Sequence, residues 1–245
     1  MVGFVIFSDE QRDRQTPPDG ATLRWLGAAL VAAAILLVGP APAHADWVRT
    51  GQWHLYSLNA ASAWKLSTGA GVVVAVVDSG VDATHVDLAG QVLPGVDLVG
   101  HGDDGRVDAV GHGTSVAALI AGKADGDGVE GLAPNAKILP VRVLDDSNRY
   151  SDAAVVARGV RWAVDHGADI INLSLGGDTR SSALAEAISY AWKHDVIVVA
   201  CTGNVDASKS GERIWYPARE PGVVAVTGLT AALLIRTPRE YSGVR

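Results

Sequence analysis

Short runs of β-branched residues alternate along the chain with segments whose apolar residues recur at helical spacing. The runs cover residues 72–77, 138–144, 170–175, 196–200 and 223–227. The first of them, VVVAVV, is apolar throughout, which is typical of a parallel strand buried on both faces. The alternation of strands and helices predicts an α/β fold, a doubly wound, mostly parallel sheet with helices on both faces.

Two helices of this pattern have recognisable ends. We expect Ser151 to cap the first helix, which runs to His166 and stops before Gly167. Ser181 or Ser182 begins the second helix. In sheets of this kind the functional groups gather where the strands end, so we expect the chemistry at the carboxyl ends of the strands.

The first 45 residues differ in character from the rest of the chain. The apolar run 26–38, LGAALVAAAILLV, precedes a small-residue site that ends at Ala45. The run is shorter than the roughly 20 residues that a membrane span requires. This pattern predicts a secretory signal peptide over residues 1–45 with an atypically long N-terminal region, and a membrane anchor is the alternative. Residues 46–70 then form an N-terminal extension.

Charge and cysteine content exclude some functions. The formal net charge is −7 and the sequence contains no run of Lys and Arg, which argues against binding to nucleic acid. Cys201 is the one cysteine of the sequence, so the chain forms no intramolecular disulfide even if it is exported. The stability of the fold must therefore come from its packed core.

Four features that could take part in chemistry lie at the ends of predicted elements. They are Asp78 after the first strand, His112 at the start of a helical pattern, Asn204 after the strand 196–200, and Ser174, Leu175 and Gly176 at the end of the strand 170–175. A histidine is a natural general base, and a side-chain amide can donate to an oxyanion. A strand end of small residues can offer its backbone to an extended peptide. Each feature has a structural alternative, namely a turn, a cap or an exposed helix start.

Taken together and in this order, the motifs resemble those of the subtilisin-like serine proteases (subtilases) across about residues 71–227. The matching segments are VVDSGV at 76–81, GHGT at 111–114, NLSLG at 172–176, GN at 203–204 and YPA at 216–218. Further segments look like those of the mycosins, which are exported, membrane-tethered subtilases of type VII secretion systems. These segments are QWHL at 52–55, RVLDD at 142–146 and NRY at 148–150.

The resemblance implies a secreted endopeptidase that hydrolyses peptide bonds with an Asp/His/Ser triad. Asp78 would orient His112, His112 would take the proton of the nucleophile, and Asn204 would hold the oxyanion. Ser174, Leu175 and Gly176 would line the substrate cleft. An extracellular or cell-envelope location, a polypeptide substrate and type VII secretion components as partners are further implications of the resemblance.

We expect neither a cofactor nor a metal ion. The acidic residues Asp125, Asp127 and Glu130 lie among glycines and lack the spacing of a calcium-binding loop. We interpret them as a solvated loop.

One part of the family pattern is missing from the sequence. The nucleophile of subtilases lies in a Gly-Thr-Ser-x-Ala-x-Pro segment after the oxyanion Asn, but the one Gly-Thr-Ser here, at 113–115, belongs to the histidine motif. We therefore expect a partial catalytic domain over 71–230, incomplete at the C-terminus, with an aberrant tail over 231–245 and no C-terminal membrane anchor. Two functions stay open: an endopeptidase by lineage, or a catalytically inert remnant or peptide-binding scaffold.

Overall fold

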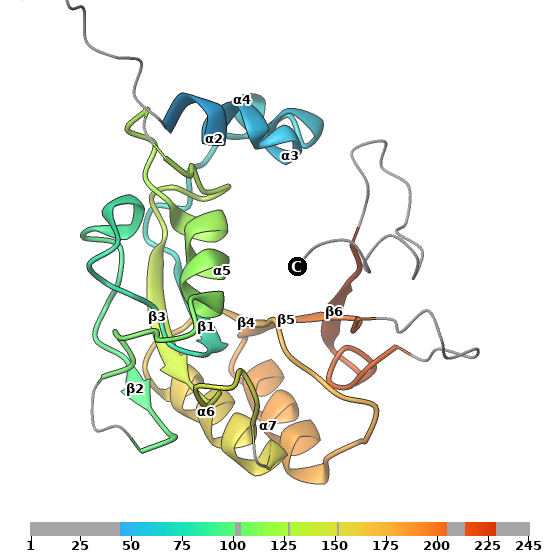
Figure 1. Cartoon of the computed structure of the whole chain (residues 1–245). Helices are drawn as coiled ribbons and strands as arrows, with labels where there is room; N and C mark the ends of the chain where they lie inside the picture. Colours follow the sequence, from blue (N-terminus) through green and yellow to red (C-terminus); the bar gives the residue numbers. More distant parts are fainter. Residues whose placement is uncertain (1–44, 101–103, 127, 151, 205–213, 229–245) are drawn as a thin grey trace, which may run out of the picture. The chain divides into compact units, whose positions relative to one another are not determined.

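The computed structural model describes residues 45–100, 104–126, 128–150, 152–204 and 214–228 of the chain. In these residues a six-stranded, fully parallel sheet forms the centre of the fold, in the order β2-β3-β1-β4-β5-β6 (Figure 1). The strands are β1 (Val73–Asp78), β2 (Val96–Asp97), β3 (Lys137–Arg142), β4 (Ile170–Leu173), β5 (Ile197–Cys201) and β6 (Val223–Val226). The predicted α/β class with a parallel sheet is confirmed.

Helices cover both faces of the sheet. The helix α5 (His112–Ala121) lies on one face, and α6 (Ala153–Asp165) and α7 (Ser182–Lys193) lie on the other (Figure 1). Alternate residues of β1 contribute to two separate hydrophobic clusters, Val74 and Val76 to the α5 side and Ala75 and Val77 to the α6–α7 side. All four are buried, which explains why this strand is apolar at every position.

The register of the strands brings several strand ends to one edge of the sheet. Val76 of β1 pairs with Asn172 of β4, and Leu173 of β4 pairs with Ala200 of β5. These three neighbouring strands end at Asp78, Leu173 and Cys201. Because β2 and β3 lie on one side of β1 and β4 to β6 on the other, this edge includes the position where doubly wound folds place their ligands.

The helix ends agree only in part with the prediction. The prediction that Ser151 caps α6 is wrong, because the carboxylate of Asp152 accepts a hydrogen bond from the N–H of Ala154 at 2.9 Å. Of the two alternatives for α7, Ser181 is the cap, and its hydroxyl accepts from the N–H of Leu184 at 3.3 Å. Gly167 adopts a φ of +82° just beyond α6, which suits the left-handed end of a helix.

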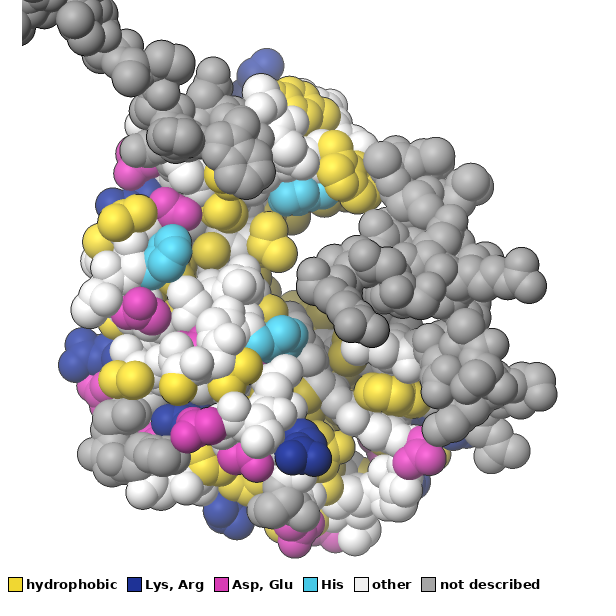
Figure 2. Space-filling view, viewed as in Figure 1, with side chains coloured by type: hydrophobic (Ala, Val, Ile, Leu, Met, Phe, Trp, Pro, Cys, Tyr) yellow, Lys and Arg dark blue, Asp and Glu magenta, His cyan; other side chains and the backbone are white. Residues whose placement is uncertain are grey.

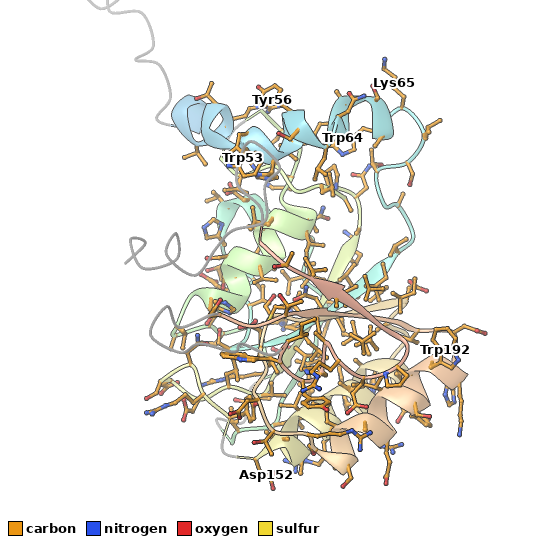
Figure 3. The ribbon with its side chains drawn as sticks, turned by 90° about the vertical axis from the view of Figure 1, so that its right-hand side faces the viewer. Trp53, Tyr56, Trp64, Lys65, Asp152 and Trp192 are labelled. Atoms are coloured by element: carbon orange, nitrogen blue, oxygen red, sulfur yellow. The ribbon has the colours of Figure 1, made fainter. Side chains whose placement is uncertain are left out.

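The N-terminal extension is helical, which the sequence patterns did not indicate. It contains α2 (Ala45–Gly51), α3 (Trp53–Ser57) and α4 (Ala60–Ala63), and Figure 3 shows its aromatic side chains Trp53, Tyr56 and Trp64. A short 3-10 helix, η1 (Val86–Leu88), follows β1. None of the described helices is long and apolar enough to span a bilayer. The predicted signal peptide, up to residue 44, and the predicted tail lie outside the described residues.

Candidate active site

Asp78 and His112 form a close pair at the end of β1. The Nδ1 atom of His112, the first residue of α5, lies 2.7 Å from Oδ1 of Asp78. The Asp78 side chain is fully buried, whereas 39% of the His112 side chain is exposed. With Nδ1 donating to the carboxylate, Nε2 carries the free lone pair of the neutral imidazole. The pair therefore combines a shielded carboxylate with a ring that substrate could reach.

The electrostatic environment favours the protonated form of His112. The hydrogen bond to Asp78 raises the pKa of His112, burial of the ring lowers it, and the charges of Asp78 and Asp108 raise it further, so that the net shift is upward. Asp78 itself accepts a second hydrogen bond through Oδ1, from the N–H of Ser79 at 2.7 Å. Its Oδ2 atom is buried without a hydrogen-bond partner among the described residues, which is unusual for a purely structural carboxylate.

A close backbone approach brings the two side chains together. A Cβ atom on Gly113 would lie 2.1 Å from the carbonyl oxygen of Gly80 and 3.1 Å from Cβ of Asp78. Contacts below 3.0 Å require the backbone to move, so residue 113 must be glycine for α5 to begin this close to β1.

A second carboxylate, Asp108, organises the loop that leads into α5. It accepts hydrogen bonds from the hydroxyls of Ser79 and Thr114 and from the N–H groups of Val110, Gly111 and Thr114, at 2.6 to 3.1 Å. Burial raises the pKa of Asp108, but these hydrogen bonds outweigh burial and the pKa is lowered overall. Asp108 is not among the residues predicted from the sequence. An Asp shortly before a predicted helix start is a typical capping signal and could have identified it.

The three residues predicted to line the cleft border a pocket. Ser174, Leu175 and Gly176 follow β4, and the Ser174 hydroxyl donates to Oδ1 of Asn172 at 2.9 Å. The pocket has a volume of about 320 Å³ and is lined by Leu144, Asn148, Arg149, Tyr150, Ser174, Leu175, Gly176 and Trp215. Asn204 is exposed and lies three residues after β5, directly after Gly203. Ser174, Leu175 and Gly176 follow β4 and Asn204 follows β5, at the edge of the sheet where β1 ends at Asp78.

Other polar residues take part in structural contacts. The rings of His166 and His194 bond through Nδ1 to backbone carbonyls one turn back in their own helices. In the acidic loop, Glu130 pairs with Arg49 at 2.6 Å, and Asp127 lies outside the described residues. Within the described part of the chain, no group of three or more His, Cys, Asp or Glu side chains is arranged to hold a metal ion.

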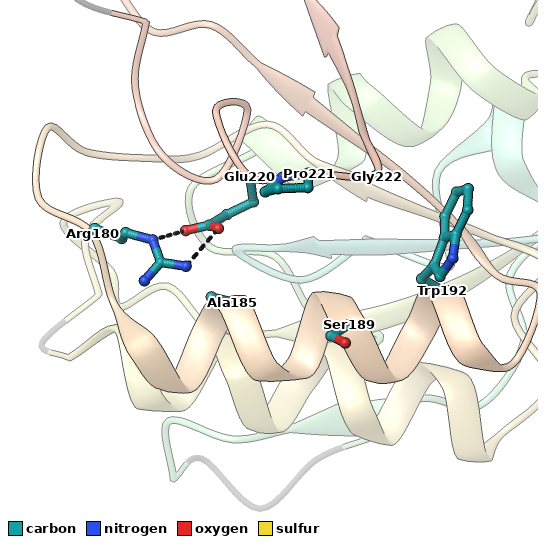
Figure 4. Close-up of a pocket in the computed structure, with 7 residues that line it drawn as sticks. All are labelled: Arg180, Ala185, Ser189, Trp192, Glu220, Pro221 and Gly222. Atoms are coloured by element: carbon teal, nitrogen blue, oxygen red, sulfur yellow. Dashed lines mark hydrogen bonds and ion pairs between the residues drawn. The ribbon is translucent and has the colours of Figure 1, made fainter.

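A larger pocket, of about 460 Å³, lies along α7 (Figure 4). Trp192 stands at one end and the ion pair of Arg180 with Glu220, with an N–O distance of 2.7 Å, stands at the other. Neither Asp78 nor His112 lines this pocket. On the face shown in Figure 2, acidic and basic side chains are interspersed rather than gathered into patches of one sign.

The sequence matches the Subtilase family (Peptidase S8) over residues 69–241. This chain belongs to the subtilase family. It is 42% identical to fervidolysin of Fervidobacterium pennivorans over 68% of this chain and 25% of that protein. It is 40% identical to thermitase of Thermoactinomyces vulgaris over 71% of this chain and 61% of that protein. The recognition of the family from its motifs is confirmed.

Two similar solved structures are mycosins. One is the MycP3 protease from the type VII (ESX-3) secretion system, with a TM-score of 0.64 and 31% identity over 74% of this chain and 59% of that chain. The other is MycP1 with its N-terminal propeptide removed, with a TM-score of 0.66 and 28% identity over 76% and 65% of the two chains. This subtilase chain spans less than two thirds of each of these relatives.

Proposed function

We propose that Asp78 and His112 are the acid–base pair of a serine-type endopeptidase site that acts on polypeptides. The observation that carries the proposal is the 2.7 Å contact between the fully buried Asp78 carboxylate and the half-exposed His112 imidazole. Membership of the subtilase family supports the reaction class, because the family match covers residues 69–241 and so includes both side chains.

In the proposed reaction the substrate lies along Ser174, Leu175 and Gly176. His112 accepts the proton of a serine hydroxyl at Nε2 as the serine oxygen bonds to the carbonyl carbon, and it returns that proton to the amine nitrogen as the C–N bond breaks. Asp78 keeps its negative charge and stabilises the imidazolium. Asn204 donates a hydrogen bond to the oxyanion that forms meanwhile.

The serine itself is not assigned in this chain. The serines after Asn204 are Ser208, Ser210 and Ser242, none lies in a Gly-Thr-Ser-x-Ala segment, and all fall outside the described residues. This observation favours a second candidate function, that of an inert remnant or peptide-binding scaffold that retains the cleft. We expect the chain as given to show no peptidase activity.

Labelling with a fluorophosphonate probe separates the two candidates for the chain as given. We expect no serine of the full chain to be labelled, because no serine after Asn204 lies in a Gly-Thr-Ser-x-Ala segment. Stoichiometric labelling of one serine, located by mass spectrometry, would contradict this expectation and show that the nucleophile is present.

The acid–base assignment itself is tested in a chain that carries a nucleophile. Sequencing the DNA downstream of the codon for Thr230 shows whether a Gly-Thr-Ser-x-Ala segment follows in another frame. In such a restored chain, Asn204→Ala should lower kcat by about 10² to 10³ with little change in KM, because the oxyanion donor acts in the transition state. His112→Ala should lower kcat further, and equally small effects of both substitutions would place the active site elsewhere.

We extend the proposal to an exported, cell-envelope protein that works with type VII secretion components. The apolar run 26–38 and the likeness to a protease of a type VII system support this extension. N-terminal sequencing of the protein recovered from the culture medium and from the envelope is the test. A mature N-terminus at Asp46 agrees with export, and recovery of the uncut chain from the cytosol contradicts it.

A further inference from the structure

Trp215 is held between the two segments that border the proposed cleft. The backbone N–H of Trp215 donates to the carbonyl oxygen of Thr202, after β5, at 2.9 Å. The next residue, Tyr216, exchanges two backbone hydrogen bonds with Gly177, after β4, at 2.7 and 2.9 Å. These hydrogen bonds fix the backbone at Trp215 to both segments.

The indole ring of Trp215 fills the space beside Gly203. A Cβ atom on Gly203 would lie 2.4 Å from both Cγ and Cδ2 of the ring, and the φ of Gly203 is +103°, so only glycine suits this position. On the other side, a Cβ atom on Gly176 would lie 3.6 Å from Cβ of Trp215. The side chain thus bridges the segments that contain Gly176 and Gly203, and it forms one wall of the pocket of about 320 Å³.

We propose that Trp215 restricts the residue on the acyl side of the cleaved bond to glycine, alanine or serine. This inference rests on the proposed function, in which that residue turns its carbonyl to Asn204 while its backbone runs along Ser174, Leu175 and Gly176. The side chain on the same Cα then projects between Gly176 and Gly203, where the indole already lies. A phenylalanine or leucine side chain has no room there unless Trp215 moves.

The test is equilibrium binding of two peptides to the full chain, which requires no nucleophile. The probes are acetylated tetrapeptide amides that are identical except for a C-terminal Ala or Phe, and Kd is measured by NMR titration. The wild-type chain should bind the Ala peptide at least tenfold more tightly than the Phe peptide. Trp215→Gly should strengthen binding of the Phe peptide at least tenfold, because it opens the space that the indole fills.

Two further variants complete the design. Trp215→Phe preserves an aromatic ring and should reduce the preference for Ala to an intermediate value, which keeps the inference testable if Trp215→Gly does not fold. Trp192→Ala removes an exposed tryptophan on α7, outside the cleft, and should leave both Kd values unchanged.

The outcomes separate this inference from the proposed function. Binding of both peptides with equal Kd, unchanged in the Trp215 variants, overturns the role of Trp215 and leaves the peptide-binding cleft in place. A wild-type preference for the Phe peptide overturns the role of Trp215 as well. Failure of the wild type and both Trp215 variants to bind either peptide overturns the proposed cleft, and the inference falls with it.

Discussion

His112 depends on two carboxylates that act in different ways. Asp78 touches the imidazole, whereas Asp108 bonds to the loop and to the first turn of α5 without a hydrogen bond to the ring. Ser79 connects the two carboxylates, because its backbone N–H donates to Asp78 at 2.7 Å and its hydroxyl donates to Asp108 at 2.9 Å. The position of the ring and its charge are therefore set by separate residues, which separate substitutions can distinguish.

Asp78→Asn should lower the pKa of His112. The hydrogen bond to the Asp78 carboxylate is the largest cause of the upward shift, and an amide removes the charge that favours imidazolium. A raised histidine pKa adds stability that is fully present below the unfolded pKa of about 6.5 and is lost as the pH rises through the folded value. Asp78→Asn should therefore lose this contribution to the free energy of unfolding at acidic pH.

NMR titration of ¹³C-labelled histidine measures the pKa of His112 in both proteins. Asp165→Asn removes a carboxylate that bonds to Tyr190 and should leave the titration of His112 unchanged. An unaltered pKa of His112 in Asp78→Asn would mean that the 2.7 Å contact does not persist in solution.

Asp108→Asn should destabilise the fold at neutral pH. The asparagine amide cannot accept all the hydrogen bonds that the carboxylate accepts, and we expect a loss of about 1–3 kcal/mol in the free energy of unfolding. Because hydrogen bonds hold the pKa of Asp108 below its usual range, its contribution is present above about pH 3.9 and disappears as the pH falls through the folded value.

Urea unfolding at pH 7 and in acid tests this expectation. The difference between wild type and Asp108→Asn should shrink as the pH falls. Asp178→Asn, at an exposed position, is the control and should change the free energy of unfolding by less than about 0.5 kcal/mol. A pH-independent difference would exclude the carboxylate charge as its cause.

At the residue scale, the sequence identified the side chains with a recognisable motif and missed those defined by contacts alone. The resemblance of their motifs to those of subtilases predicts that Asp78 and His112 share one site, although 34 residues separate them. Trp215 was missed because its importance comes from packing against Gly203, which no local pattern reports. Asn204 stays a prediction as an oxyanion donor.

Among the elements, the start of α5 shows a conflict between local preference and packing. Alanine is preferred over glycine in a helix by about 0.5–1 kcal/mol, so helix propensity alone favours Gly113→Ala. The added Cβ would lie 2.1 Å from the carbonyl oxygen of Gly80, and the backbone of α5 would have to shift. We expect the clash to prevail, with a net destabilisation of about 1–3 kcal/mol.

Gly51→Ala is the matched control, because Gly51 ends α2 and a Cβ there would have no atom within 4 Å. Thermal melts of both variants, with circular dichroism as the readout, compare them. Gly113→Ala should melt below the wild type and Gly51→Ala should not. Equal or higher melting of Gly113→Ala would show that α5 can move away from β1 without cost.

The elements were predictable where they were long and apolar. The five predicted strands are present with ends that differ by a few residues, since neighbouring strands rather than propensity decide where pairing stops. The strand β2 has two residues, too few for any periodicity. The helices α2 to α4 are similarly short, and α6 begins at an Asp152 cap where two adjacent polar residues compete for the same role.

In the whole molecule, one buried side chain joins the N-terminal helices to the body of the fold. Gln52 is 5% exposed and makes a reciprocal pair with the backbone of Glu130, its amide donating at 2.8 Å and its carbonyl accepting at 3.0 Å. The ion pair of Arg49 with Glu130 and the bond from the Trp64 indole to the carbonyl oxygen of Leu132 add to this attachment. Because α2 to α4 are each short, their stability depends on these contacts.

Gln52→Ala should therefore release α2 to α4 before the rest of the fold unfolds. The substitution leaves the buried N–H and carbonyl of Glu130 without their partner, at a cost of about 1–3 kcal/mol, which raises the population of the locally open form about 5- to 150-fold. Trypsin cleavage at the exposed Lys65 should accelerate by that factor while hydrogen exchange of β1 stays slow. Gln91→Ala, which removes a buried amide bonded to carbonyls inside the body, should lower the protection of β1 instead. If Gln52→Ala also weakened protection of β1 to the same extent, the N-terminal helices and the sheet would unfold as one cooperative unit, and the extension would belong to the same folding unit as the sheet.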